Sequence, residues 1–260
     1  MTGAAEPLVR VETDQGVATL TLNSPHNRNA LSTPLMTELL AALAEVAEDD
    51  SVRVVVLSHT GPVFCSGVDL KETAAARERG TVPAAKLGDV LAAVWEFPKP
   101  VVARIGGPAR AGGLGLIAAA DIAVCTEDAT FAFTEVRIGV IPAIISATVL
   151  PRLNQRAAAE FYLTGNTFDG RQAAQIGLVT TATPADALDS TVLAYCRALL
   201  HGGPNALVGT KALLRRTPAA TIREELAQLS EMSLGYFLSD EGREGALAFR
   251  EKRQPAWVQE

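Results

Sequence analysis

The sequence predicts an α/β fold, because short β-rich runs alternate with helical runs over most of the chain. The run 52–60 is the apolar, β-branched kind that is typical of a strand buried on both faces of a parallel sheet. Hydrophobic residues make up 48% of the 260 residues and charged residues 20%, which indicates a globular protein with a sizeable core. Strand signals fade after about residue 182, so the C-terminal part is predicted to be helical.

The N-terminal region opens with a predicted β-hairpin. Two β-rich runs, 8–13 and 16–22, are separated by Asp-Gln-Gly, which is typical of a tight turn. A helix is expected over 31–49, with Ser32 as its N-cap. Its apolar residues recur at helical spacing, at Met36, Leu39, Leu40, Leu43 and Val46 or Ala47.

The strand and helix signals continue in the same rhythm through the next part of the chain. Glycine and proline clusters mark the ends of the runs. The expected elements are a strand over 52–60, a loop over 61–72 that leads into a helical stretch, a helix over 87–97, a buried strand over 101–105, and two short strands over 121–126 and 130–135.

The C-terminal part reads as a series of helices, over 184–203, 205–216, 219–240 and 241–254. In the third of these, Ile222, Leu226, Leu229 and the run 233–237 form an apolar stripe. Such a stripe serves either packing onto the α/β body or contact between subunits. We divide the chain into a core over 1–195 and a C-terminal helical region over 196–260.

Charge and cysteine content exclude several classes of function. The net charge of -6 argues against a nucleic-acid surface and against an anionic membrane face. No apolar window reaches the roughly 20 residues of a membrane span, and the N-terminus lacks the features of a signal peptide. Cys65, Cys125 and Cys196 are odd in number and widely spaced, which fits reduced thiols and not a zinc site. We expect a cytoplasmic protein without metal.

Two glycine-bearing stretches, 52–70 and 101–120, share the order strand, loop and turn into a helix. The start of a helix leaves backbone N–H groups without partners, and glycine allows a ligand to approach them closely. Two such starts facing one point would form an oxyanion hole. The spacing fits neither a dinucleotide fingerprint nor a P-loop. The structural alternative is a close contact between helix and sheet.

Few side chains are candidates for acid–base chemistry. Glu135 is flanked by mostly apolar residues, and partial burial would raise its pKa toward the range that a general acid/base needs. The alternative is a structural ion pair with Arg137. His26, His59 and His201 lie in no recognisable nucleophile or metal arrangement, so we expect them in loops or on the surface.

Four ordered motifs, at 23–32, 63–72, 109–124 and 131–143, resemble the crotonase, or enoyl-CoA hydratase/isomerase, superfamily. The resemblance extends to 164–179 and 246–253 and so covers nearly the whole chain. It implies a crotonase-like spiral of repeated ββα turns with a C-terminal helical region that builds homotrimers or homohexamers. It also implies an acyl-CoA substrate, with coenzyme A as part of that substrate and no separate cofactor.

By match to the family motifs, the backbone N–H groups of Val68 and Gly112 should stabilise the enolate of the thioester, and Glu135 should be a catalytic carboxylate. Hydratases of this family typically carry a second glutamate, which would fall at Gly115 here. We expect a 2-enoyl-CoA hydratase. A Δ3-Δ2 enoyl-CoA isomerase with one glutamate, or a catalytically silent paralogue that binds acyl-CoA, are the alternatives. The substrate-binding residues implied are Ser66, Gly67, Asp69, Leu70, Gly113, Gly115 and Pro142.

Other charged residues near these motifs have competing interpretations. Asp69 and Glu72 could reach the site, but a carboxylate at a helix start is the better interpretation of Asp69. Lys71, Lys252 and Arg253 could meet coenzyme A phosphates, or be solvated. The walls of the acyl pocket are expected from the segments 73–90 and 141–149.

Overall fold

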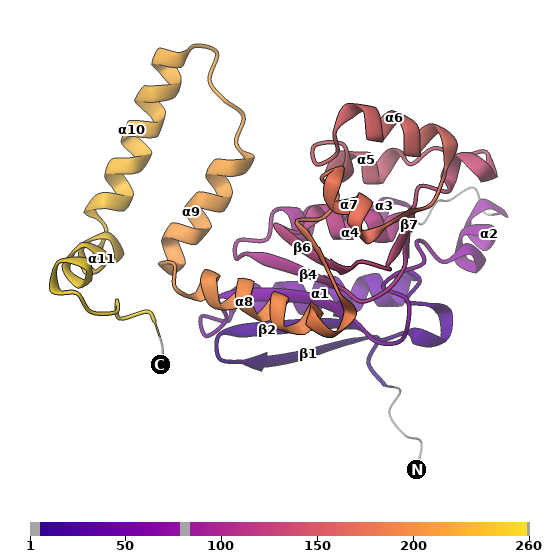
Figure 1. The fold of residues 1–260 in the computed structure, drawn as a ribbon, viewed down its shortest axis with the longest axis horizontal. Coiled ribbons are helices and arrows are strands. Elements are labelled where there is room, and N and C mark those ends of the chain that lie inside the picture. The colour runs from indigo at the N-terminus through magenta and orange to yellow at the C-terminus, as the bar shows by residue number, and fades with distance from the viewer. Residues whose placement is uncertain (1–5, 79–83, 259–260) are drawn as a thin grey trace.

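The computed structural model describes residues 6–78 and 84–258 (Figure 1). A six-stranded sheet crosses the body, and its strands are all parallel to their neighbours except for the antiparallel first pair. In spatial order the strands are β1 (Val9–Asp14), β2 (Val17–Leu22), β3 (Val54–His59), β4 (Val101–Ile105), β6 (Ile122–Thr126) and β9 (Thr181–Thr183). The predicted α/β class is confirmed.

The N-terminal hairpin forms as predicted, between β1 and β2. Gln15 and Gly16 both have positive φ, at 46° and 81°, as the two central residues of a type I′ hairpin turn require. The helix after it, α1 (Thr33–Glu48), is capped by Ser32, whose hydroxyl accepts a hydrogen bond from the Leu35 N–H at 3.4 Å. The predicted cap and the predicted apolar face of this helix are therefore correct.

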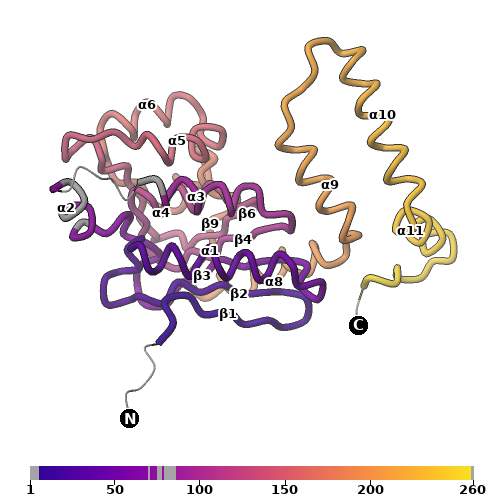
Figure 2. The backbone as a smooth tube through the Cα atoms, turned by 180° about the vertical axis from the view of Figure 1, so that it is seen from behind, coloured from indigo at the N-terminus to yellow at the C-terminus, as the bar shows by residue number. Residues whose placement is uncertain are grey.

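Helices cover both faces of the sheet (Figure 2). Successive residues of a strand point alternately to the two faces. Val55 and Leu57 belong to the larger core cluster, together with residues of α1, α3 (Ala84–Trp95) and α4 (Gly112–Ala119). Val54 and Val56 face the other way and pack against α8 (Leu188–Leu200). Burial on both faces explains why the strand sequence is continuously apolar.

A second, smaller sheet stands beside the first and carries part of the candidate site. Its strands are β5 (Ala109–Arg110), β7 (Thr130–Ala132) and β8 (Phe168–Asp169), in that order. The rings of Phe133, Phe161 and Phe168 pack together, with centroids 4.4 Å apart for Phe161 and Phe168. The shorter elements around both sheets are η1 (Pro25–Asn27), α2 (Leu70–Glu78), η2 (Glu135–Ile138), α5 (Ala143–Val149), α6 (Gln155–Thr164), α7 (Gly170–Gln175) and η3 (Ala185–Ala187).

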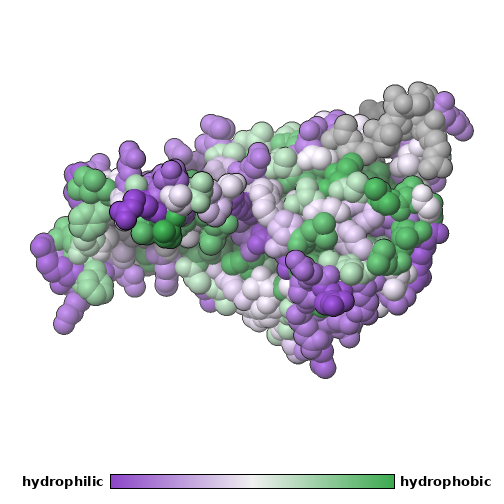
Figure 3. Space-filling model, turned by 90° about the horizontal axis from the view of Figure 1, so that it is seen from above, coloured by the Kyte–Doolittle hydropathy of each residue, from purple (hydrophilic) through white to green (hydrophobic). Residues whose placement is uncertain are grey.

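The last three helices, α9 (Pro204–Arg215), α10 (Ile222–Leu238) and α11 (Asp240–Glu251), form an arm that extends away from the body (Figure 1). The boundary predicted at 195/196 lies inside α8, which packs on the sheet, so the arm begins only at α9. Helix α10 contains no buried residue, and Ile222 and Phe237 are 74% and 72% exposed. Hydrophobic side chains gather on the arm and, separately, on the upper face of the body (Figure 3). Within the described residues, no helix is both long and apolar enough to span a membrane.

The expectation that all three histidines lie in loops or on the surface is wrong for His59. This residue ends β3 and is only 8% exposed, whereas His26 and His201 are exposed. Its Nε2 accepts a hydrogen bond from the Gly106 N–H at 3.0 Å. Burial lowers the pKa of His59, because it disfavours the charged imidazolium. His59 thus holds the Gly106 backbone at the end of β3.

Candidate active site

Three chain segments run parallel, side by side, and bring the predicted site residues together. Cys65 pairs with Ala109 of β5 in a parallel bridge, and Ala109 pairs with Phe131 of β7, also in parallel. Val68, Gly112 and Glu135 each follow within a few residues of these pairs. Because the carboxyl ends of parallel strands meet at one edge, the two predicted N–H donors and the predicted carboxylate lie at the same edge.

The first turn directs the Val68 N–H. Gly67 has a φ of 94°, and a Cβ added there would lie 2.9 Å from the Ala111 Cβ. Leu31 pairs with both sides of Val68: its N–H donates to the Gly67 carbonyl at 2.7 Å, and its carbonyl accepts from the Asp69 N–H at 3.4 Å. Within the described part of the chain, the Val68 N–H itself has no acceptor.

The second turn directs the Gly112 N–H. Ala111 has a φ of 47° and a ψ of -118°, a conformation that favours glycine and costs an alanine on the order of 1–3 kcal/mol. Gly112 is the first residue of α4, so its N–H has no partner within the helix, and no other described residue accepts from it. A Cβ on Gly67 would be only 3.6 Å from the Gly112 nitrogen, which shows how closely the two turns approach.

The small residues behind these donors are required by packing. A Cβ on Gly112 would lie 2.9 Å from the Leu31 Cδ1, and one on Gly113 would lie 2.8 Å from the Cys65 Cβ. Leu87 of α3 also approaches Gly112, at 3.5 Å from the added Cβ position. The predicted pocket-wall segment 73–90 therefore reaches the donor turn through Leu87, while its part 79–83 lies outside the described residues.

Glu135 begins η2, three residues after the end of β7. Its Oε2 is buried and has no hydrogen-bond partner among the described residues. Burial raises the pKa of the Glu135 carboxyl above its ordinary value. The alternative of an ion pair with Arg137 is wrong, because Arg137 turns to the loop after α6 and donates to the Thr164 carbonyl and to the Asn166 Oδ1.

The position expected to carry a second glutamate is sealed. A Cβ on Gly115 would lie 2.8 Å from the Ile145 Cγ2 and 3.1 Å from the Leu91 Cδ1. Ile145 and Leu91 are both 3% exposed, so neither can move aside into solvent. Among the described residues, an apolar wall of Ile145 and Leu91 therefore stands where the second glutamate was expected.

Two hydroxyl groups near Glu135 were not predicted from the sequence. The Ser146 hydroxyl of α5 lies 3.4 Å from the Tyr162 hydroxyl of α6 and donates to the Pro142 carbonyl at 2.7 Å. The Tyr162 ring stacks at 4.4 Å from Phe133, two residues before Glu135. Burial raises the pKa of Tyr162, and the charge of Glu135 raises this pKa further. Only the fold brings α5 and α6 to this loop.

The remaining predicted residues have mostly structural partners. Asp69 caps α2, accepting from the Lys71 and Glu72 N–H groups at 2.8 Å and 3.2 Å. The Glu72 carboxylate accepts from the Thr33 N–H and hydroxyl. Ser66 donates from its backbone to the Arg28 carbonyl at 3.0 Å. Leu70 begins α2, but its side chain lies outside the described ones.

Three residues were candidates for contact with coenzyme A phosphates: Lys71, Lys252 and Arg253. Among the described residues, each has another partner or none. Arg253 forms ion pairs with Glu244 and Glu251, at 2.6 Å and 2.8 Å. Lys252 has a φ of 56° and ends α11, and Lys71 is exposed at the start of α2. Neither lysine contacts Glu135 or the two donor turns in a hydrogen bond or ion pair among the described residues.

The family model described as enoyl-CoA hydratase/isomerase matches residues 12–260. The chain belongs to the enoyl-CoA hydratase/isomerase family. Members of this family act on acyl-CoA substrates as hydratases or isomerases, so the chain is a crotonase-family protein of that general kind. The predicted superfamily is confirmed.

Individual family members agree with this chain over nearly its whole length. The structure of Pseudomonas aeruginosa AtuE has a TM-score of 0.91 and 36% identity, covering 97% of this chain and 100% of that one. An enoyl-CoA hydratase of Mycobacterium smegmatis has a TM-score of 0.89 and 34% identity, covering 98% and 100%. The peroxisomal Delta(3,5)-Delta(2,4)-dienoyl-CoA isomerase of Arabidopsis thaliana is 30% identical, covering 96% of each chain. The predicted crotonase-type fold is thereby confirmed.

Proposed function

We propose that the protein is a 2-enoyl-CoA hydratase in which Glu135 is the only carboxylate that transfers protons. The buried, unpartnered Oε2 of Glu135 carries this proposal. A buried polar group without a partner is costly, so a ligand or water that completes its hydrogen bonding is expected. The name of the Mycobacterium smegmatis relative supports the hydratase assignment.

The two backbone donors stabilise the charge that develops during the reaction. The thioester carbonyl oxygen would accept hydrogen bonds from the Val68 and Gly112 N–H groups. These groups are fixed before the substrate arrives, because Leu31 holds the first turn and α4 begins at the second. Donors of this kind act most strongly on the enolate oxygen, where negative charge is greatest.

One carboxylate suffices to add water across the double bond. The Glu135 carboxylate takes a proton from a water molecule while the water oxygen bonds to the β-carbon, and the electron pair of the double bond moves to the enolate. The protonated Glu135 then returns the proton to the α-carbon. The sum is one water added and an unchanged enzyme. The raised pKa of Glu135 suits a group that alternates between the two forms.

A Δ3-Δ2 isomerase is the second candidate, and the sealed space at Gly115 favours it. An isomerase needs only one proton-transfer group, which removes a proton from the α-carbon of a 3-enoyl-CoA and returns it to the γ-carbon. Ile145 and Leu91 leave no space for a second carboxylate at Gly115, and isomerisation does not need one. A silent acyl-CoA-binding protein is the third candidate, and the unpartnered carboxylate argues against it.

Two assays separate the three candidates. Crotonyl-CoA loses its enoyl-thioester absorbance when it is hydrated, whereas a 3-enoyl-CoA gains that absorbance when it is isomerised. We expect turnover of crotonyl-CoA. Turnover of the 3-enoyl-CoA alone would replace the hydratase with the isomerase. Binding of both without turnover would establish the silent protein.

We also propose that the arm builds a homotrimer or homohexamer. The support is the apolar surface of α9 and α10, which border a groove of about 370 Å³ lined in part by Leu213, Leu229 and Met232. Exposed apolar surface of this extent is typical of an interface. Sedimentation at micromolar concentration should give the trimer or hexamer mass, and a monomer would contradict the proposal.

A further inference from the structure

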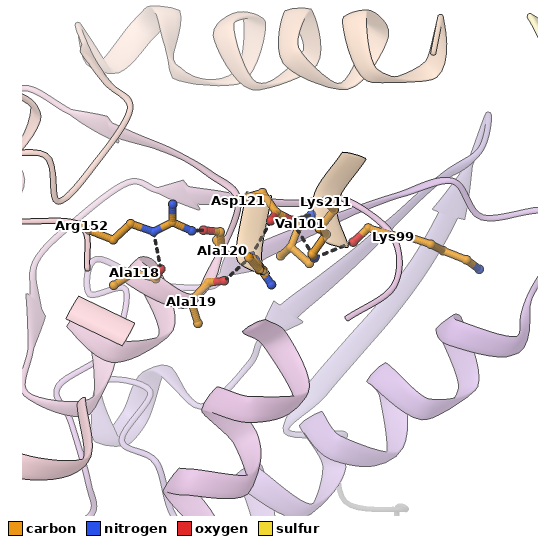
Figure 4. Close-up of polar contacts among 9 residues, drawn as sticks. Lys99, Val101, Ala118, Ala119, Ala120, Asp121, Arg152 and Lys211 are labelled. Atoms are coloured by element: carbon orange, nitrogen blue, oxygen red, sulfur yellow. Dashed lines mark hydrogen bonds and ion pairs between the residues drawn. The ribbon is translucent and has the colours of Figure 1, made fainter. Parts of the chain in front are cut away.

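Helix α4 has a different chemical environment at each of its ends. Its N-terminus presents the Gly112 N–H to the candidate site. At its C-terminus, Arg152 donates to the Ala118 carbonyl at 3.1 Å and to the Ala120 carbonyl at 3.0 Å (Figure 4). Arg215 of α9 donates to the Ala119 carbonyl at 3.4 Å. The carbonyls that end the helix are therefore held by two guanidinium groups.

The residue after the helix, Asp121, ties this end to the arm. Its carboxylate forms an ion pair with Lys211 at 2.7 Å (Figure 4). It forms a second ion pair with Arg215, and both cations come from α9. The same carboxylate accepts a hydrogen bond from the Val101 N–H of β4 at 2.8 Å. Lys211 also donates to the Lys99 carbonyl at 2.9 Å. One carboxylate thus joins α4, the central sheet and the arm.

Positive charge is in excess at this end of the helix. Lys211 and Arg215 pair with the Asp121 carboxylate, and Arg152 joins them over the Trp95 ring, where the two guanidinium groups lie 5.0 Å (Arg152) and 4.5 Å (Arg215) from the ring centroid. Lys211 is only 8% exposed. Burial lowers the pKa of Lys211 to about 8, so at pH 7 the ammonium is still mostly charged. Cations at the C-terminus of a helix interact favourably with its dipole.

We propose that Arg152, Lys211 and Arg215 form a cationic clamp that positions α4 and strengthens the oxyanion hole at its other end. The eight residues of α4 span only about 12 Å, so both ends belong to one rigid element. The clamp fixes the direction of the helix, and its net positive charge favours negative charge at the Gly112 N–H. Two of its three cations come from α9, so the position of the arm affects the strength of the oxyanion hole. This inference rests on the proposed function.

Arg215 and Arg216 offer a matched test, because they are adjacent arginines of similar burial that pair with different parts of the molecule. Arg215 pairs with Asp121 of the body, whereas Arg216 pairs with Glu225 and Gln228 of the arm. The first probe is acetoacetyl-CoA, whose enolate absorbs in the near ultraviolet. The second probe is butyryl-CoA, whose α-carbon is too weakly acidic to form a measurable enolate. The enolate-to-keto ratio of bound acetoacetyl-CoA measures the oxyanion hole, and butyryl-CoA affinity measures ordinary binding.

We expect Arg215→Met to lower the bound enolate-to-keto ratio about threefold to tenfold, the size expected when one charge about 12 Å away is removed at an effective dielectric constant of about 20. Butyryl-CoA affinity should stay within about twofold, because its thioester carbonyl stays neutral and gains little from the clamp. Arg216→Met should leave both readouts at the wild-type values. An unchanged enolate ratio in Arg215→Met, or an equal loss for both ligands, would overturn the clamp.

Arg152→Met tests the clamp from the body, without a change in the arm. It should lower the enolate ratio in the same direction as Arg215→Met, and a wild-type ratio would contradict the proposal even if Arg215→Met displaced the arm. Failure of the proposed function has a different signature. If the wild-type protein itself bound acetoacetyl-CoA with no enolate, the oxyanion hole would be wrong, and the clamp would have no function to support.

Discussion

The surroundings of Glu135 and those of Gly115 differ sharply, although one helix, α5, borders both. Successive residues of α5 face the two regions. Ile145 fills the space beside Gly115, at 2.8 Å from an added Cβ, whereas Ser146 places a hydroxyl beside Tyr162 near the Glu135 loop. The contrast separates a position closed by apolar side chains from a position that carries a carboxylate beside two hydroxyl groups. The space beside Gly115 is packed with apolar atoms, whereas the Glu135 loop lies near the hydroxyl groups of Ser146 and Tyr162.

This difference has an energetic basis. A charged carboxylate at Gly115 would be enclosed by Ile145, Leu91 and the buried α4, where its desolvation is costly. At Glu135 the cost is lower, since the residue is only partly buried, although burial still raises its pKa. The two regions therefore predict opposite responses to a change of charge.

The largest expected effect comes from removing the retained carboxylate. Glu135→Gln keeps the shape of the side chain but cannot transfer a proton, so kcat should fall about 10²- to 10⁴-fold. The bound enolate of acetoacetyl-CoA should remain detectable, because both oxyanion donors are backbone groups. Steady-state turnover and the ligand spectrum measure the two quantities. A Glu135→Gln variant with wild-type kcat would remove Glu135 from the mechanism.

The second effect comes from restoring the absent carboxylate. Gly115→Glu should lower the free energy of unfolding by about 2–4 kcal/mol, because it overpacks the core and buries a charge. The double variant Gly115→Glu/Ile145→Ala should lose less stability than the sum of the two single losses, because the smaller side chain at 145 makes space for the glutamate. Urea unfolding of both single variants and the double variant gives the coupling energy. Strict additivity would mean that Ile145 does not seal this position.

The same double variant tests which reaction the site is built for. If the missing acid limits hydration, Gly115→Glu/Ile145→Ala should gain hydration of crotonyl-CoA relative to Ile145→Ala alone. A gain in hydration without a gain in isomerisation would show that the sealed wall selects against water addition. No gain would support hydration by Glu135 alone.

Local features of this molecule were predictable from the sequence, and long-range ones were not. The Ser32 cap, the hairpin turn at Gln15 and Gly16, and the turn into a helix within 101–120 each depend on a few neighbouring residues, and all were found. Glycine spacing also indicated the two donor turns. Their meeting could be expected only through the family resemblance, because it depends on strand pairing between Cys65, Ala109 and Phe131.

The unpredicted features all involve partners that are distant in the sequence. Nothing near Gly115 indicates that Ile145 fills its side. Arg137 finds its partners at Thr164 and Asn166, and not at the neighbouring Glu135. The burial of His59 follows from its place at the end of a central strand. A pattern of residue types cannot reveal such contacts, since it carries no information about which surfaces meet.

A smaller effect separates the two regions by pH. Because burial raises the folded-state pKa of Glu135, the folded protein binds more protons than the unfolded chain between the ordinary glutamate pKa and the raised one. The free energy of unfolding that this group contributes is present at low pH and is lost as pH rises through the raised pKa. Glu135→Gln should therefore gain stability relative to wild type as pH rises toward neutrality. Thermal unfolding across this range should show the two curves diverging upward in pH, and parallel curves would contradict the buried carboxylate.

The smallest expected effect compares successive residues of α5. Ser146→Ala removes one hydrogen bond to the Pro142 carbonyl and one contact with the Tyr162 hydroxyl, and should cost about 0.5–1.5 kcal/mol of stability. Ile145→Val removes one buried methyl group and should cost about the same. Their effects on catalysis should differ, because only Ser146 is coupled to the Glu135 region.

We expect Ser146→Ala to lower kcat about threefold. The corresponding rise in the activation free energy is smaller than the roughly 1.4 kcal/mol of a tenfold change. Ile145→Val should keep the wild-type kcat. Tyr162→Phe should resemble Ser146→Ala, since it removes the other hydroxyl of the pair. Turnover and urea unfolding of the three variants, measured together, decide the matter. If stability and turnover fell in the same proportion in all three, the hydroxyl pair would be part of the packing alone, and the two sides of α5 would not differ in function.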